Sequence, residues 1–182
     1  MLLDIAKAFD SVWHDALIHK LRVINTSESI THIIRNYLSN RKVYVTVNGI
    51  TSSIKDIRAG VPQGSILGPI LYNIFTNDIL ISDKTHLAIY ADDTALYASS
   101  WSLAQATKYL QNHLDQIVSY HKNWKISINP TKTQAITFTR KITKPTKQIQ
   151  IHGYQIPWTN SNYQKCCRWL FTRCETYPAN EI

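Results

Sequence analysis

Cysteine is scarce in this chain of 182 residues, and long apolar runs are absent. The three cysteines, Cys166, Cys167 and Cys174, fit no common zinc-site spacing, and their odd number argues against a disulfide framework. They are interpreted as free thiols in a reducing compartment. No apolar run reaches the length of a membrane span, and no signal peptide precedes the first predicted strand. We therefore expect neither a membrane-spanning protein nor a disulfide-stabilised domain.

Acidic residues are also few. The chain has 12 Asp and Glu against 20 Lys and Arg, so its formal net charge is +8 and its isoelectric point lies near 9.4. This balance suits a polyanionic partner, and nucleic acid is the leading candidate. An anionic membrane surface is the alternative, but no long amphipathic basic helix supports it. A content of 44% apolar and 10% aromatic residues predicts a folded chain, and its length favours a single domain.

Short apolar segments separated by turn residues predict the secondary structure. Asn48-Gly49 predicts a hairpin turn, Asn129-Pro130 a further turn, and Ser102 with Gln105 a capping box at the start of a long helix. The predicted helices are Ala16–Ile24, Glu28–Leu38, Ile66–Leu80 and 103–124. The predicted strands are Met1–Ile5, Val43–Val47, Ser53–Arg58, Thr85–Ile89, Thr94–Ala98, Ile126–Ile128, Ala135–Thr139 and Ile149–Ile151. Helices and hairpins without strict β-α-β alternation predict an α+β fold.

The tetrapeptide Tyr90-Ala91-Asp92-Asp93 lies between two predicted strands, so it predicts a tight turn that carries two carboxylates. Two adjacent carboxylates destabilise a turn unless water or a cation compensates their charge. A third carboxylate, Asp4, follows the apolar start of the chain. Asp4 and Asp92 on neighbouring strands would form a divalent-metal site of the kind that supports phosphoryl transfer.

Five blocks of the sequence together resemble the palm of a reverse transcriptase, of the type found in jockey-like, non-LTR (LINE-type) retrotransposons. In chain order they are LDIAKAFDSVWH, YLSNRKVYVTVNG, AGVPQGSILGPILYNIFTNDI, IYADDTALYA and NWKISINPTKTQAITF. The resemblance covers residues 1–160 and implies a polymerase palm-like antiparallel sheet packed on helices, with the fingers and thumb mostly missing. One YADD tetrapeptide would be weak support, but five ordered blocks are specific.

The resemblance implies roles for the three carboxylates. Asp4 and Asp92 match the metal ligands of the family, which points to Mg²⁺, with Mn²⁺ as a substitute. Considered alone, Asp4 also suits a turn or a helix cap. Adjacent residues on a strand point to opposite faces, so Asp93 is assigned a secondary, positioning role in catalysis, with a solvated turn residue as the alternative.

The resemblance also implies a substrate pocket. The backbone at Ile5, next to Asp4, would contact the triphosphate. Phe9 matches the aromatic residue that lies under the incoming sugar and excludes a 2′-hydroxyl, although a purely structural Phe is a serious alternative. Gln63 matches a residue that touches the template and the nucleotide, and Gly64 would let the backbone approach closely. A simple turn is the alternative for this loop.

Three basic residues complete the predicted site. Lys132 matches a residue near the leaving pyrophosphate, where it would act as an acid or a charge clamp, and a surface lysine after a turn is the alternative. Arg41 and Lys42 precede a strand and are candidates for contacts with nucleic-acid phosphates. Their sequence does not distinguish this role from simple solvation.

The chain departs from the family pattern at both ends, which suggests a piece of a longer polypeptide. No fingers strands precede the first palm block, and residues 161–182 form an atypical tail where the thumb is expected to begin. One hypothesis is a frameshifted thumb entry, since permitted codons for Trp169–Tyr177 can encode Gly-Tyr-Leu-Leu-Asp-Ala-Lys-Leu in the next frame.

The resemblance therefore implies an RNA-directed DNA polymerase that adds dNTPs to a DNA primer on an RNA template. An endonuclease domain is expected elsewhere in the parent polypeptide, and the resemblance implies an intracellular location, in the nucleus and cytoplasm, for the parent element. The alternative is an inactive, truncated retrotransposon relic that at most binds nucleic acid.

Overall fold

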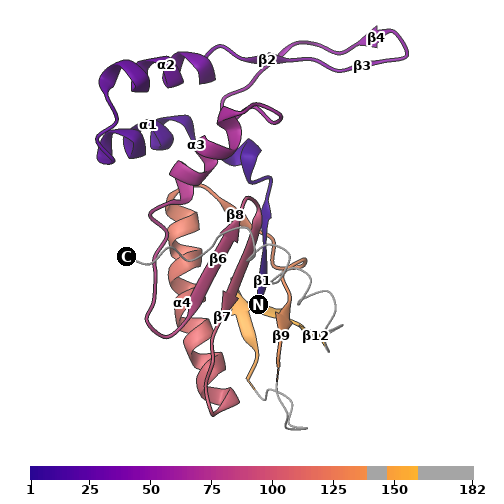
Figure 1. The fold of residues 1–182 in the computed structure, drawn as a ribbon. Helices are drawn as coiled ribbons and strands as arrows, with labels where there is room; N and C mark the ends of the chain where they lie inside the picture. Colours follow the sequence, from indigo (N-terminus) through magenta and orange to yellow (C-terminus); the bar gives the residue numbers. More distant parts are fainter. Residues whose placement is uncertain (139–146, 160–182) are drawn as a thin grey trace.

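A computed structural model describes residues 1–138 and 147–159 of the chain, and the predicted tail 161–182 lies outside them. The centre is an antiparallel sheet with the strand order β6-β7-β1-β8 (Figure 1). The bounds of its strands are Leu2–Ala6 for β1, His86–Tyr90 for β6, Asp93–Tyr97 for β7 and Ser127–Ile128 for β8. With the helices described below, this sheet confirms the predicted α+β class.

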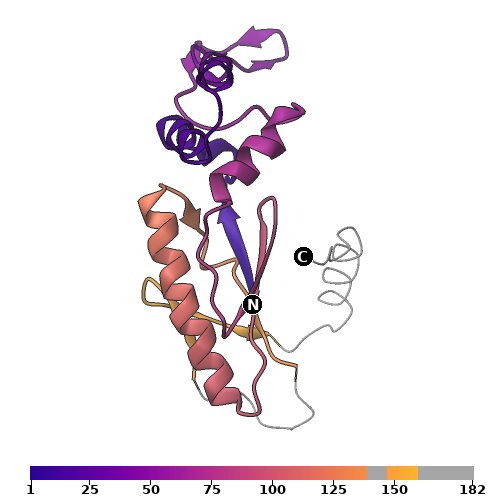
Figure 2. The ribbon, with the colours of Figure 1, turned by 60° about the vertical axis from the view of Figure 1, so that its left-hand side comes forward.

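Helix α4, Leu103–Asn123, covers one face of this sheet, as Figure 2 shows. The register pairs Leu3 with Thr94, so Leu3 and Leu96 project from the same face as neighbours on adjacent strands. Both belong to the buried cluster that includes Leu114 and Ile117 of α4. Because successive strand residues alternate between faces, Asp4 and Asp93 lie on the opposite face, away from α4.

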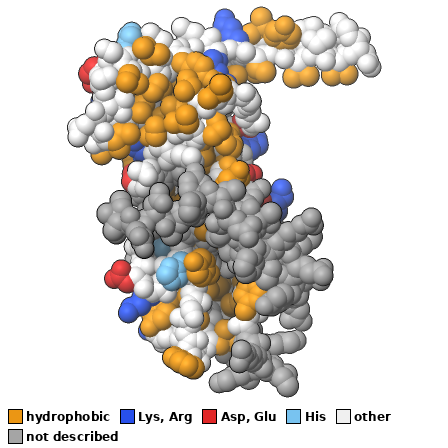
Figure 3. Space-filling model, in the orientation of Figure 1, with side chains coloured by type: hydrophobic (Ala, Val, Ile, Leu, Met, Phe, Trp, Pro, Cys, Tyr) orange, Lys and Arg blue, Asp and Glu red, His pale blue; other side chains and the backbone are white. Residues whose placement is uncertain are grey.

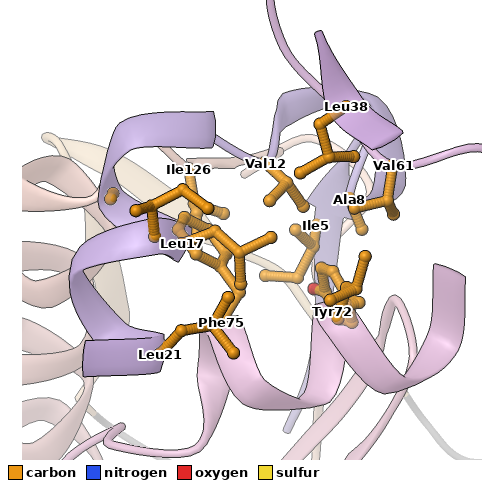
Figure 4. Packing of buried hydrophobic residues seen from close by; sticks show 13 residues of the cluster. Ile5, Ala8, Val12, Leu17, Leu21, Leu38, Val61, Tyr72, Phe75 and Ile126 are labelled. Carbon is orange, nitrogen blue, oxygen red and sulfur yellow. The ribbon is translucent and has the colours of Figure 1, made fainter. Parts of the chain in front are cut away.

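A second core lies beyond the end of β1, among α1 (His14–Val23), α2 (Glu28–Leu38) and α3 (Leu67–Thr76). Figure 4 shows its side chains converging between α1 and α3. The fully buried members include Val12, Leu17, Leu21 and Phe75. A short 3-10 helix, η1 (Phe9–Ser11), connects β1 to this core and therefore brings the first block of the sequence next to α3.

A long hairpin projects from this helical group (Figure 1). It comprises β2 (Lys42–Val43), β3 (Thr46–Val47), β4 (Ile50–Thr51) and β5 (Lys55–Asp56). The predicted Asn48-Gly49 turn is confirmed, since both residues have positive φ angles of 50° and 80°. Apolar side chains line the exposed arm, which Figure 3 shows extending from the body.

Short strands complete the described fold. Strand β9 (Ala135–Ile136) pairs with β12 (Trp158–Thr159), and β10 (Ile149–Ile151) pairs with β11 (Tyr154–Ile156). Both β10 and β11 contribute to the buried cluster against α4. No helix in the described part of the chain is long and apolar enough to cross a membrane.

Several local predictions were wrong in detail. The predicted strand Val43–Val47 is divided between β2 and β3, and α3 ends at Thr76 rather than at Leu80. Ser102 is the N-cap of α4, but its side chain makes no capping hydrogen bond, so the predicted capping box is wrong. These departures leave the order of elements unchanged.

Candidate active site

The three predicted carboxylates lie at one end of the central sheet. Asp4 of β1 lies directly opposite Asp93, the first residue of β7. Residues directly opposite in an antiparallel pair share a face, so these two carboxylates are neighbours. Asp92 lies in the turn between β6 and β7, where Ala91 adopts a positive φ of 53°, and its side chain is exposed. The cross-strand partner of Asp4 is therefore Asp93, whereas Asp92 occupies the turn.

A cavity of about 330 Å³ opens beside this turn. Five of the predicted site residues line it together: Ile5, Phe9, Gln63, Gly64 and Asp92. The remaining lining residues are Lys7, Ala8, Pro62 and Pro69. The cavity thus joins residues from the first, third and fourth sequence blocks. The other predicted site residues, Asp4, Asp93, Lys132, Arg41 and Lys42, lie outside its lining.

The loop that carries Gln63 is fixed against η1. The Gln63 Nε2 donates a hydrogen bond to Asp10 Oδ1 at 2.8 Å, and the Val61 backbone N–H donates to the Phe9 carbonyl at 2.8 Å. At Gly60, φ is +87°, and a Cβ atom would lie 2.8 Å from the Cα and carbonyl oxygen of Asp10. Glycine is required there because any side chain would collide with the backbone. Space beside Gly64 is open, whereas Gly60 lies in close contact with the Asp10 backbone.

Tyr72 of α3 packs against the ring of Phe9. The two rings stack with their centroids 4.9 Å apart and their planes at 29°, and Tyr72 is only 2% exposed. Burial, with a further contribution from the negative charge of Asp92, raises the pKa of Tyr72 to about 12. Tyr72 therefore stays neutral at physiological pH. Tyr72 lies within the third sequence block, but no role was predicted for it from the sequence.

Lys132 lies in a turn that contacts Asp4. The Asn129 backbone N–H donates to the Asp4 carbonyl at 2.8 Å, and the Asp4 N–H donates to Thr133 Oγ1 at 3.4 Å. Thr133 is fully buried and Lys132 is exposed. The Asn129 side chain accepts from the Thr131 N–H at 3.1 Å, which agrees with the predicted turn. Lys132 is thus one residue from a side chain that touches Asp4.

Arg41 has a defined contact within the chain. Its Nη1 donates to the Gly60 carbonyl at 2.9 Å, and His14 Nε2–H donates to the same oxygen at 2.8 Å. Lys42 is exposed on β2, opposite Asp56 of β5. Arg41 therefore supports the loop before Gln63, and Lys42 lies on the surface of the projecting hairpin.

A buried charge cluster around Lys20 was not singled out by the sequence analysis. Lys20 of α1 is 4% exposed, and its ammonium donates to Asp78, to the Phe75 carbonyl at 2.5 Å and to Tyr120 Oη at 2.7 Å. It also lies 3.9 Å from the ring centre of Trp124. Burial lowers the pKa of Lys20, and the hydrogen bond and charge of Asp78 oppose that shift without cancelling it. The cluster joins α1 to the ends of α3 and α4.

Comparison with known proteins identifies the family. Residues 1–170 match the model of the reverse transcriptase (RNA-dependent DNA polymerase) family. The chain belongs to the reverse transcriptase family. It is 41% identical over 148 residues to the RNA-directed DNA polymerase from mobile element jockey of Drosophila funebris, which covers 77% of this chain and 16% of that protein. It is 38% identical over 162 residues to a probable RNA-directed DNA polymerase from transposon BS of Drosophila melanogaster, which covers 84% of this chain and 18% of that protein. The chain thus spans less than a fifth of the length of these relatives.

Reverse transcriptases generally use divalent metal ions. Within residues 1–138 and 147–159, no group of three or more His, Cys, Asp or Glu side chains is arranged to enclose a metal. Mg²⁺ commonly binds one or two carboxylates and completes its octahedron with water and substrate phosphates. The hard oxygen donors of Asp92, which lines the open cavity, and of the cross-strand pair Asp4 and Asp93 fit that mode of binding. They do not fit a closed, all-protein metal cage.

Proposed function

We propose that this chain is the palm of an RNA-directed DNA polymerase of a non-LTR retrotransposon, which adds a dNTP to the 3′-hydroxyl of a DNA primer on an RNA template. The observation that carries the proposal is the meeting of three sequence blocks at one cavity. Ile5 and Phe9 come from the first block, Gln63 and Gly64 from the third, and Asp92 from the fourth. Asp4 and Asp93 lie opposite each other on the adjoining strands.

In this reaction the primer oxygen forms a bond to the α-phosphorus, and the bond between that phosphorus and the pyrophosphate oxygen breaks. The primer hydroxyl loses its proton, and pyrophosphate leaves. Asp4 and Asp92 are the carboxylates that we assign as ligands of Mg²⁺, for which Mn²⁺ can substitute, and Asp93 positions them. When bound, the ion neutralises charge on the attacking and leaving oxygens.

The cavity walls suit a deoxynucleotide. Phe9 is half-buried and held by Tyr72, so its ring presents a fixed wall to the sugar. The Gln63 amide is oriented by its hydrogen bond to Asp10, which leaves its carbonyl oxygen to accept hydrogen bonds from a base or template. The backbone of Ile5 lies at the same cavity and is assigned to the triphosphate.

The charged surface supports nucleic-acid binding. The formal net charge of +8 favours a polyanion. Arg41 and Lys42 lie at the base of the projecting hairpin, and we assign them to template or primer phosphates. Lys132, on the turn that contacts Asp4, is assigned to the leaving pyrophosphate.

The proposal is tested by Mg²⁺-dependent primer extension with the parent polypeptide that contains this chain. Asp92→Ala is expected to abolish extension while leaving nucleic-acid affinity nearly unchanged, because the basic surface supplies that affinity. Asp83→Ala, at an exposed aspartate outside the cavity lining, is the matched control and is expected to retain the wild-type rate. Continued synthesis by Asp92→Ala would refute the metal assignment. Binding without extension by the unmodified polypeptide would instead identify an inactive relic.

A second variant tests the cavity wall. Phe9→Val is expected to admit ribonucleotides, so the ratio of kcat/KM for dNTP over that for the matching rNTP falls. The same ratio is measured for Phe138→Val, an exposed aromatic outside the cavity lining, where no change is expected. Unchanged discrimination in Phe9→Val would show that Phe9 only packs.

A further inference from the structure

A second concave surface is lined in part by Ile57 and Arg58, which lead into the loop that carries Gln63. This cleft has a volume of about 510 Å³ and is bounded by the start of α1, the end of α2 and the segment after β5. Its polar lining comprises His14, Asp15, Arg35, Ser39, Asn40 and Arg58. None of these residues lines the catalytic cavity.

Two guanidinium groups face this cleft without partners. Arg35 and Arg58 are both exposed, and neither forms an ion pair or a side-chain hydrogen bond with the described residues 1–138 and 147–159. The other two arginines of the described residues are engaged, since Arg22 pairs with Glu28 and Arg41 donates to the Gly60 carbonyl. The cleft therefore contains two guanidinium groups whose N–H donors have no acceptor among the described residues.

The remaining polar groups of the cleft do not neutralise these arginines. Asp15 is the one carboxylate in the lining, and it lies more than 4.0 Å from either guanidinium. His14 commits its Nε2–H to the Gly60 carbonyl at 2.8 Å. Two cations against one carboxylate leave the hollow with a net positive charge. Paired N–H donors of guanidinium groups match the oxygens of a phosphate in a bidentate manner.

The cleft is close enough to the catalytic cavity for one polyanion to reach both. Arg58 and Gln63 are five residues apart in the sequence, so their backbones lie at most about 18 Å apart. Between them, the Gly60 carbonyl is held from both sides by His14 and Arg41. The two surfaces are thus fixed relative to each other by the loop they share.

We propose that Arg35 and Arg58 bind the phosphodiester backbone of the nucleic-acid substrate at a site outside the catalytic cavity. The inference rests on the proposed function, because it takes the template and primer as the ligand. Phosphate contacts of this kind position a strand without reading its sequence. The site therefore holds the register of the duplex while Asp92 and Phe9 act on the incoming nucleotide.

The test measures binding of a fluorescein-labelled RNA–DNA duplex to the 182-residue chain by anisotropy, without Mg²⁺ or dNTP, across a series of KCl concentrations. The slope of log K against log salt falls by about 0.9 for each phosphate contact that is lost. Arg35→Ala/Arg58→Ala is expected to reduce the slope by nearly 2 and to weaken binding about tenfold or more at low salt. Arg35→Lys/Arg58→Lys keeps both charges, so most of the slope is expected to remain.

The matched control is Lys108→Ala/Lys122→Ala, which removes the same charge from exposed positions of α4 outside the cleft. An equal effect of the two alanine pairs would overturn the site, because net charge alone would then explain the binding, and the proposed function would stand. Failure of the unmodified chain to bind the duplex would overturn the binding part of the proposed function and the cleft together. Displacement of the duplex by millimolar inorganic phosphate would identify a small-anion site and would also overturn the proposal.

Discussion

Glycine at position 60 is predicted to be essential for the stability of the loop that lines the candidate cavity. Gly60 and Gly64 have similar left-handed backbones, with φ angles of +87° and +79°. Their surroundings differ. A Cβ atom on Gly60 would lie 2.8 Å from the Asp10 backbone, whereas a Cβ atom on Gly64 would meet nothing within 4 Å. The pair therefore separates backbone strain from steric overlap.

The size of each effect follows from these surroundings. Placing an alanine in the left-handed region costs roughly 1 kcal/mol at either position. Two carbon atoms attract each other best at about 3.5–4.0 Å, so a separation of 2.8 Å is strongly repulsive. The atoms that the new Cβ would meet belong to the Asp10 backbone, so no side-chain rotation can relieve the overlap. Overpacking of this kind costs about 1–3 kcal/mol. Gly60→Ala is therefore expected to lose about 2–4 kcal/mol of unfolding free energy, and Gly64→Ala about 1 kcal/mol.

Urea denaturation of the two variants, followed by tryptophan fluorescence, measures the difference. A small domain has about 5–15 kcal/mol of stability, so a shift in the midpoint is readily resolved. Gly60→Ala should also disturb the hydrogen bond from Gln63 to Asp10, because the added Cβ atom would displace the backbone of Asp10. Equal destabilisation by the two variants would refute the close approach of Gly60 to Asp10 as a property of the folded chain.

Two further predictions concern buried polar groups. Tyr72 has a folded-state pKa raised to about 12, so its contribution to stability is present below pH 10 and is lost as the pH rises toward 12. Between those values the unfolding free energy of the unmodified chain should fall by about 3 kcal/mol more than that of Tyr72→Phe, as measured by urea denaturation at each pH; parallel curves would refute the raised pKa. Asp78→Ala leaves the Lys20 ammonium without its carboxylate and is expected to lower the unfolding free energy by about 2–3 kcal/mol. This loss is smaller than for a fully buried ion pair because Asp78 is half-exposed and solvent screens its charge. The double variant Lys20→Met/Asp78→Leu removes both charges and is expected to be neutral or stabilising by thermal unfolding; a larger loss than in Asp78→Ala would contradict this account.

The elements predicted best from the sequence are those whose limits are set locally. Helix α2 begins and ends at the predicted residues, Glu28 and Leu38, because Ser27 caps it by accepting a hydrogen bond from the Ile30 N–H. Helix α3 was predicted too long because the apolar pattern continues beyond Thr76. The helix ends there as Asp78 turns toward Lys20 and Tyr120, which lie far away in the sequence. Local periodicity contains no information about such a contact.

Burial of α2 could not be predicted from its amphipathic pattern. The sequence places Ile30, Ile33, Ile34, Tyr37 and Leu38 on one face, yet Ile30 and Ile33 are 50% and 65% exposed. Leu38 is buried against the core. Hydrophobic periodicity shows that a face is apolar, but it does not show which surface covers that face. Figure 3 shows this apolar surface over the helical group.

For the candidate site, motif matching identified the residues that line the cavity but not the residues that hold them. Phe9, Gln63 and Asp92 lie in recognisable blocks, and all three reach the cavity. Tyr72 and Asp10, which orient Phe9 and Gln63, act through contacts between distant parts of the chain. The roles of all the site residues stay predictions, since their placement is compatible with the assignments without testing them.

The contacts of Gly60 connect the loop of the cavity to the start of the projecting hairpin. Its N–H donates to the Val12 carbonyl, and its own carbonyl accepts from both His14 and Arg41. Arg41 immediately precedes β2, so one residue links the start of the hairpin to the loop that carries Gln63. If a nucleic-acid strand binds the hairpin and displaces it, we expect the displacement to reach the Gln63 loop through the hydrogen bond from Arg41 to Gly60. Loss of the Arg41 contact should consequently disturb nucleotide binding as well as nucleic-acid binding, even though Arg41 lies outside the cavity lining.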